Sequence, residues 1–307
     1  MNARNIRKHL TAKMDDWLES IDDKQLCGTI RQEAIITGGA IVSLLNNETP
    51  NDYDVYFKTK EACLAVANYY VDKWNEAHSE SDKHAEVREE DGQVKVFIQN
   101  VGVAAEDDYS DSDERDYDLD LKNRFGGTLE DESETPDEKE TSEKTDHENK
   151  PKYRPVYLTS NAITLSNKIQ IVIRFYGDVD EIHKNYDFVH CTCSWTYYPN
   201  NLNLPSEALE AIINKELVYI GSRYPLCSLM RVRKYLDRGY HINAGQLVKM
   251  AFQIHDLDLK NIKVLQDQLM GVDSGYFSFL IDALSKKYSG TEEVETNYVI
   301  ELLNRMF

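Results

Sequence analysis

The stretch Thr37-Gly-Gly-Ala-Ile-Val-Ser-Leu-Leu-Asn-Asn-Glu-Thr-Pro-Asn-Asp-Tyr-Asp-Val-Tyr-Phe57 decides how this chain can fold. An apolar run at residues 34–36 leads into Gly38 and Gly39, and a short helical pattern follows at residues 41–45. A strand that passes through glycines into a helix presents backbone N–H groups that can hold phosphate. The stretch therefore predicts a strand, a glycine turn and a helix with the capacity to bind an anion.

Two carboxylates follow this glycine turn. After a turn at Pro50, Asp52 and Asp54 lead into residues 55–57, which have the composition of a strand. Residues two apart on a strand point to the same face, so we expect both carboxylates side by side near the glycine turn. A divalent ion bound by both would relieve their repulsion, and Mg²⁺ is the oxygen-preferring candidate. The plainer alternative is that residues 50–52 are only a turn before a strand.

This pattern resembles the catalytic head of the nucleotidyltransferase superfamily that includes DNA polymerase β. Within it, the pattern is most similar to bacterial poly(A) polymerases and class II CCA-adding enzymes. The positions that match their motif are Gly38, Gly39, Ile41, Leu44, Leu45, Pro50, Asp52, Asp54 and Val55. The Arg and Asp of the family motif are Val42 and Ser43 in this sequence. The resemblance implies an α+β fold, with a head built on a mixed β-sheet flanked by helices and followed by an all-α neck and body.

The superfamily needs a third carboxylate from a strand that neighbours the Asp-x-Asp strand. Residues 186–189 have the aromatic-Asp-Phe-apolar setting in which this acid often lies, and residues 186–191 are expected to begin a strand. The resemblance therefore assigns the third position to Asp187, because a lone Asp among apolar neighbours is costly unless it is paired or metal-bound. Asp178 and Asp180, in a connector, are the competitors, and a strand-start or helix-capping role is the alternative for Asp187. Residues 161–195 also resemble nucleotidyltransferase-like proteins of large viruses and tailed phages.

The net charge of −19 is concentrated in one segment. Residues 106–150 contain 19 acidic and 6 basic residues, a net charge of −13, whereas the rest of the chain contains 35 and 29, a net charge of −6. Because residues 105–150 are poor in apolar side chains, we expect a largely disordered insert in the head. A solvated insert without a chemical role is the simpler interpretation, and mimicry of nucleic acid in a basic channel is the alternative.

Periodicity divides the chain into a mixed part and a helical part. Helical spacing is present in residues 6–18 and 60–76, and strand patterns are present in residues 94–98 and 168–175. After residue 203 only helical patterns follow. We therefore predict a head over residues 1–203 and a helical C-terminal domain over residues 204–307.

One predicted helix, residues 223–239, carries basic side chains at i, i+3 and i+7. These basic residues are Arg231, Lys234 and Arg238. Its apolar side is expected from Leu226, Leu229 and Leu236. Residues 224–226 and Arg231 resemble the neck motif with which poly(A) polymerases and CCA-adding enzymes contact the nucleotide and RNA. The basic stripe either binds phosphates or is a solvated face.

The composition predicts a cytoplasmic protein. No run of about 18 apolar residues is present, and the N-terminal residues lack the apolar region of a signal peptide, so we expect no membrane contact. Five cysteines, odd in number and scattered, indicate reduced thiols. We expect the protein in the cytoplasm, which is the host cytoplasm if a phage encodes it.

The chemistry implied by the resemblance is transfer of a nucleotidyl group from an NTP, such as ATP, to an acceptor hydroxyl, with release of pyrophosphate. Asp52 and Asp54 are expected to hold two Mg²⁺ ions, and Asp187 is expected to share one of them. The Gly38-Gly39 turn and Ser43 are expected to bind the β and γ phosphates, and Arg231 is a further candidate for the triphosphate. The implied acceptor is an RNA 3′ end resembling that of tRNA. The alternatives are a catalytically silent nucleotide-binding or virion-associated protein, or a transferase that modifies a protein or a small molecule.

Overall fold

The computed structural model describes most of the chain outside the acidic segment and part of the C-terminal region. The described residues are 1–79, 84–90, 92–98, 104–106, 151–269, 284, 287, 288 and 295–306. The predicted insert at residues 105–150 lies outside them, apart from the backbone of residues 105 and 106. No helix in these described ranges is long and apolar enough to cross a membrane.

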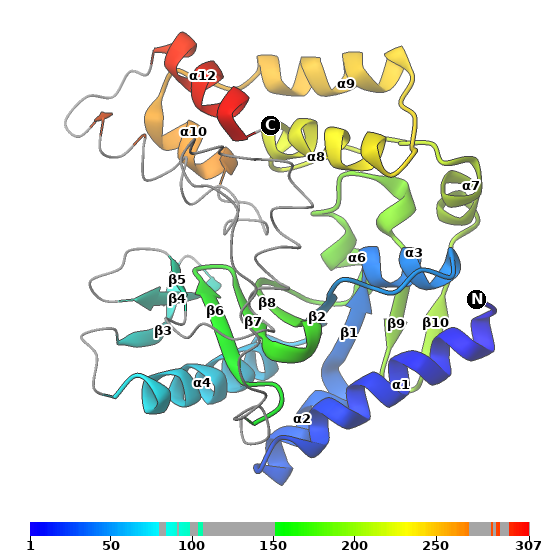
Figure 1. Cartoon of the computed structure of the whole chain (residues 1–307), viewed down its shortest axis with the longest axis vertical. Helices are drawn as coiled ribbons and strands as arrows, with labels where there is room; N and C mark the ends of the chain where they lie inside the picture. The colour runs from blue at the N-terminus through cyan, green and yellow to red at the C-terminus, as the bar shows by residue number, and fades with distance from the viewer. Residues whose placement is uncertain are drawn as a thin grey trace, which may run out of the picture.

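An eight-stranded sheet is the centre of the described structure (Figure 1). Its strands, in spatial order, are β10 (Asn201–Asn203), β9 (Ser194–Thr196), β1 (Ala34–Thr37), β2 (Tyr53–Phe57), β8 (Ile169–Tyr176), β7 (Ala162–Leu165), β6 (Pro155–Thr159) and β5 (Ala104–Glu106). The sheet is mixed, because β2 and β8 run parallel whereas the other neighbouring pairs are antiparallel. A separate hairpin joins β3 (Ala85–Glu90) to β4 (Gln93–Ile98).

Three helices cover one face of this sheet, and we call it the closed face. They are α1 (Ala3–Glu19), α2 (Lys24–Glu33) and α4 (Lys60–Ala77). The predicted apolar stripe of α1 is confirmed, since its members Leu10, Met14 and Trp17 are fully buried. They share a core cluster with Val55 and Phe57 of β2. The closed face therefore holds the largest part of the core and fixes β2 in place.

The opposite face of the sheet is covered more sparsely, and we call it the open face. A small cluster there joins Ile35, Tyr56 and Val172 to Ile182 of α6 (Val179–His183). Because side chains alternate along β2, Asp54 lies on the same face as Tyr56, and Val55 lies on the other. Figure 1 shows α6 and α3 (Gly39–Leu45) between the end of the sheet and the C-terminal helices.

No strand follows β10 among the described residues, where helices and two isolated β-bridges are found, as predicted for an α+β fold with an all-α continuation. The helices are α7 (Ser206–Asn214), α8 (Pro225–Asp237), α9 (Ala244–His255), α10 (Ile262–Leu269) and α12 (Thr296–Met306). The predicted apolar side of α8 is wrong in part, since Leu226 is buried but Leu229 and Leu236 are 42% and 45% exposed. Cys227 and Val232 are buried in their place.

The predicted strand at residues 186–191 is also wrong. Asp187 lies in a loop after α6, Phe188 makes only an isolated bridge with Tyr219, and residues 189–191 form a 3₁₀ turn. The packing of Phe188 against Tyr219 and Tyr235, with ring centroids 5.7 and 5.5 Å apart, explains the difference. These aromatic neighbours come from the helical part of the chain, so tertiary contacts override the strand propensity of the segment.

Candidate functional site

The glycine turn between β1 and α3 is built as the sequence predicts. β1 ends at Thr37, Gly38 has φ 86° and ψ −142°, and α3 begins at Gly39. Residues with a Cβ rarely adopt this backbone conformation, so glycine suits the position. A Cβ at Gly38 would lie 3.4 Å from the Tyr186 hydroxyl oxygen and 3.7 Å from Asp54 Oδ2. The turn therefore brings its backbone close to both a tyrosine hydroxyl and a carboxylate.

Asp52 and Asp54 lie at the start of β2. Asp54 is the second residue of the strand and is half-buried, and Asp52 directly precedes the strand. Asp54 pairs in register with Gln170 of the parallel strand β8. On the other side, the pairing of Ile36 with Val55 places Thr37 at the level of Asp54. Gly38 and Asp54 are thus neighbours across the boundary between two adjacent strands.

A row of polar residues crosses the open face at the level of Asp54. The register of the ladders places in this row Ser194, Thr37, Asp54, Gln170, Thr164 and Tyr157. Thr37, Thr164 and Ser194 are buried. Neither β1 nor β8, the strands that flank β2, contains an acidic residue in its described range. The sheet itself therefore surrounds Asp54 with hydroxyl and amide groups.

Three side chains, Tyr56, His183 and Tyr186, form a polar group next to Thr37, and we call this group the polar floor. The Tyr186 hydroxyl donates to that of Tyr56 at 3.3 Å, and the Thr37 hydroxyl donates to the carbonyl oxygen of Cys193 at 2.9 Å. Since the single hydroxyl hydrogen of Thr37 is used there, His183 Nε2, 2.7 Å from Thr37 Oγ1, carries the proton. Burial lowers the pKa of His183. Burial, followed by Tyr56 and Asp54, raises the pKa of Tyr186 well above its ordinary value, so its hydroxyl stays protonated.

Asp187 is held by a basic side chain of α8. Its side chain is 4% exposed and accepts a hydrogen bond from Arg231 Nη1, whose side chain is 21% exposed. The backbone carbonyl oxygen of Asp187 also accepts from the Ile220 N–H at 2.9 Å. The carboxylate predicted for the metal and the guanidinium predicted for the triphosphate are therefore bonded to each other, joining the loop after α6 to α8.

The other predicted residues fall at separate places. Ser43 lies about one helical turn after Gly39 in α3 and is half-buried. Lys234 and Arg238 of the basic stripe lie near the end of α8. Within the part of the chain that the structure describes, no group of three or more His, Cys, Asp or Glu residues could hold a metal ion.

The donor set around Asp54 suits one hydrated magnesium ion. Mg²⁺ commonly uses one or two carboxylates and completes its shell with water and substrate phosphates. Asp54 beside the glycine turn and Asp52, two residues earlier in the chain, provide up to that number of carboxylates. Sequence reasoning missed the polar floor of Tyr56, His183 and Tyr186, because only strand register and tertiary packing bring these residues together.

Comparison with known proteins assigns the family. The family model described as Gabija anti-defense 2 family protein matches residues 8–215, more than half of the chain. The chain belongs to the Gabija anti-defense 2 family. The range matched by the Gabija anti-defense 2 model includes Gly38, Asp54 and Asp187 but ends before Arg231.

Individual relatives and solved structures are only 10–23% identical to this chain. The Gabija anti-defense 2 protein of Bacillus phage SPbetaL7 is 23% identical over 245 residues, which are 79% of this chain and 42% of the relative. The chain therefore spans less than half of that relative's length. The Thermotoga maritima CCA-adding enzyme complexed with tRNA is 11% identical with a TM-score of 0.40, over 95% of this chain and 59% of that one. A tRNA-processing enzyme with CTP is 10% identical with a TM-score of 0.37, over 85% and 56% of the two chains.

Proposed function

We propose that this chain is a magnesium-dependent nucleotidyltransferase that counters Gabija defence on behalf of a phage, in the host cytoplasm. The observation that carries the proposal is the position of Asp54 beside the Gly38 turn on the open face of the sheet, with Asp52 two residues earlier in the chain. Family membership supports the anti-defence part of the proposal.

The residues around the turn have distinct roles in this proposal. Asp52 and Asp54 hold Mg²⁺, and the first backbone N–H groups of α3, with the Ser43 hydroxyl, bind the β and γ phosphates of an NTP. When bound, magnesium neutralises the triphosphate and lowers the pKa of the attacking hydroxyl. The Tyr186 hydroxyl, hydrogen-bonded to Tyr56, lies near the same Gly38 turn as Asp54 and adds no charge to the site.

Asp187 stays a prediction as the third ligand, with the second Mg²⁺ ion that it would share. Arg231 binds Oδ2 of Asp187, so a metal would either be bound by the other carboxylate oxygen or displace Arg231. Displacement would release Arg231 for the triphosphate. Gln170, in register with Asp54 on the neighbouring strand β8, offers an amide oxygen as an alternative third ligand.

The acceptor in this proposal is a hydroxyl of RNA, with a tRNA-like 3′ end as the first candidate. A second candidate is a hydroxyl on a protein of the Gabija system, which the family name favours. A silent, nucleotide-binding role is the opposing hypothesis, because the flanking strands β1 and β8 supply no third acid to β2.

Transfer of label tests the proposal. The full chain is incubated with Mg²⁺, each α-³²P-labelled NTP, and either total RNA or an extract of cells that express Gabija, and the products are separated into RNA, protein and small molecules. We expect label in one fraction, lost in Asp52→Asn and Asp54→Asn but retained in Asp72→Asn, which alters an exposed Asp of α4. Thermal melts confirm that the variants are folded. Absence of transfer to all three fractions would contradict the proposal.

A further inference from the structure

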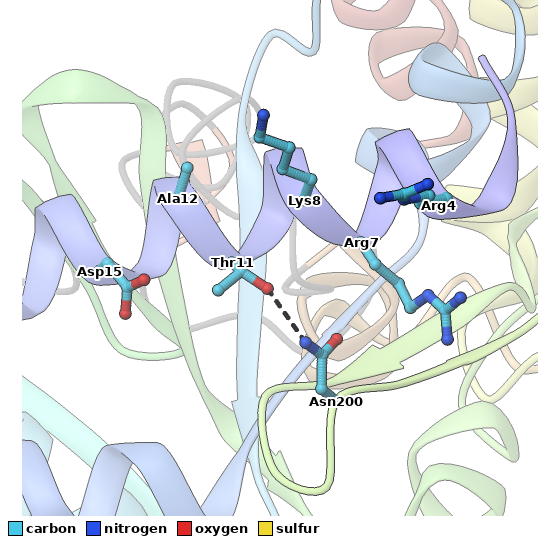
Figure 2. A pocket seen from close by; sticks show the side chains of 7 residues that line it. All are labelled: Arg4, Arg7, Lys8, Thr11, Ala12, Asp15 and Asn200. Atoms are coloured by element: carbon cyan, nitrogen blue, oxygen red, sulfur yellow. Dashed lines mark hydrogen bonds between the residues drawn. The ribbon is translucent and has the colours of Figure 1, made fainter.

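A shallow groove of about 510 Å³ runs along the outer side of α1. It is lined by Arg4, Arg7, Lys8, Thr11, Ala12, Asp15 and Asn200. Figure 2 shows Arg7, Thr11 and Asp15 on the side of the helix that faces Asn200, with Lys8 projecting from the other side. The groove thus places Arg7 opposite the turn between β9 and β10, with Arg4 and Lys8 completing its positively charged lining on the same helix.

The cations of the groove are available to a ligand. Arg4, Arg7 and Lys8 are exposed, and none makes an ion pair with another residue of the described ranges. The first acidic residue of α1 is Asp15, at the far end of the groove, where its Oδ1 accepts the Tyr197 hydroxyl. Within the described ranges, the three cations therefore form a cluster of positive charge without an acidic partner.

Asn200 adds a hydrogen-bond donor that points toward the helix. Its Oδ1 accepts the Trp195 indole N–H at 2.9 Å, and its Nδ2 donates to Thr11 Oγ1 at 3.4 Å. With the oxygen bonded to the indole, the amide nitrogen faces the groove, and its second hydrogen can reach a ligand. The groove is therefore lined mainly by donors and cations and suits a ligand rich in anionic acceptors.

The lining is held rigidly. The inner side of α1 places Leu10, Met14 and Trp17 in the core at 0% exposure, and the two bonds from Asn200 and Tyr197 fix the β9–β10 turn against the outer side. Arg7 and Thr11 are separated by about 6 Å along the helix axis. Donors at fixed intervals suit a chain of repeated phosphates better than a single small anion.

An exposed aromatic side chain lies in the same turn. Tyr198 is 58% exposed, two residues before Asn200, and its carbonyl oxygen accepts from Lys58 Nζ at 3.2 Å. Cations that follow a phosphate backbone, next to an aromatic ring on which a base can stack, are the combination used to bind single-stranded nucleic acid. An acidic protein segment would use the cations but not the aromatic platform.

We propose that the groove along α1 binds single-stranded nucleic acid through its phosphodiester backbone, with Tyr198 stacking on a base. The groove is separate from the candidate active site, because α1 packs on the closed face together with Val55, whereas Asp54 lies on the open face. The proposal does not depend on the proposed transferase activity. A strand held on α1 is anchored on the opposite side of the sheet from the reacting groups.

Fluorescence anisotropy with a 5′-labelled single-stranded 12-mer, of RNA and of DNA, tests this surface in buffer without Mg²⁺ or NTP. In Arg4→Gln/Arg7→Gln/Lys8→Gln we expect at least a tenfold loss of affinity. The slope of the logarithm of affinity against the logarithm of salt concentration should become shallower by about 2, which corresponds to three lost phosphate contacts. Tyr198→Ala is expected to weaken binding by about fivefold or more.

The matched control makes the same change of charge at exposed lysines elsewhere: Lys24→Gln/Lys260→Gln/Lys263→Gln. We expect this control to bind as the unmodified chain does. Equal affinity of the two triple variants would overturn the proposal, as would competition by poly-glutamate that matches competition by unlabelled oligonucleotide. Because the assay contains no NTP, its result is independent of whether the chain transfers nucleotides.

Discussion

The ion pair between Asp187 and Arg231 gives the most informative prediction on stability. The two side chains are 4% and 21% exposed and join the loop after α6 to α8. Removing one partner of a buried ion pair costs about 3–5 kcal/mol, because a charge is left buried and uncompensated. Arg231 is partly solvated, so we expect the lower end, about 3 kcal/mol for Asp187→Asn and slightly less for Arg231→Met.

The double variant isolates the interaction. Because Asp187→Asn/Arg231→Met leaves no uncompensated charge, its loss of unfolding free energy should be smaller than the sum of the two single losses by about 1–3 kcal/mol. Urea unfolding of the four proteins, with the m-value checked for each, measures this coupling. Losses that add within about 0.5 kcal/mol would refute the reasoning that the pair is a structural link.

The same four proteins decide the predicted metal role of Asp187. If Asp187 shares a magnesium ion, the double variant is inactive in the label-transfer assay even though its stability is partly restored. Transfer by the double variant at the level of the unmodified chain would remove Asp187 from the metal site. Stability and activity therefore report separately on the two roles of this carboxylate.

Three further predictions follow from buried groups. His190 is 1% exposed among Phe188, Tyr235 and Tyr240, and burial first, then Arg238 and Lys215, lowers its pKa to about 3. Below pH 6.5 the unfolded chain therefore binds a proton that the folded chain does not. As the pH is lowered from 6.5 to 3, the free energy of unfolding should fall by up to about 1.4 kcal/mol per pH unit. His190→Phe should reduce this slope in urea titrations at several pH values, whereas the exposed His255→Gln should not; equal slopes would contradict the assignment. Gly38→Ala should cost about 1–3 kcal/mol in urea unfolding, from its φ of 86° and the nearby Tyr186 hydroxyl, and should abolish transfer; a neutral substitution would show that the turn adapts. Leu10→Ala should cost about 2–5 kcal/mol by the cavity that it leaves at a fully buried position, and a change in melting temperature no larger than that of the exposed Gln25→Ala would contradict this packing.

The sequence pattern predicted individual helices, strands and turns, because each of these depends on residues close together in the chain. The 3.6-residue spacing of α1, the helix at α4 and the strand at β8 are confirmed, since each has one apolar side and one clear period. The glycine turn was predictable because few residue types adopt its backbone conformation. Position within the sheet was not predictable, because strand order and register depend on contacts between distant segments.

One wrong prediction shows where sequence reasoning stops. Residues 186–191 have aromatic and β-branched side chains typical of a strand, but their partners are Tyr219, Tyr235 and Tyr240 of the helical part, which no local pattern reveals. The ion pair between Arg231 and Asp187 was equally hidden, because a basic stripe on a helix has the same spacing whether it faces solvent, phosphate or a buried acid. Phosphate binding by Arg231 stays a prediction.

Binding of manganese measured by electron paramagnetic resonance tests the central claim most directly, because Mn²⁺ replaces Mg²⁺ at oxygen ligands and its free form gives a distinct spectrum. With a non-hydrolysable NTP analogue, we predict bound Mn²⁺ in the unmodified chain and in Asp72→Asn, and loss of that signal in Asp52→Asn and Asp54→Asn. Undiminished Mn²⁺ binding in both carboxylate variants would contradict the account, because the ion would then be held elsewhere than beside the Gly38-Gly39 turn.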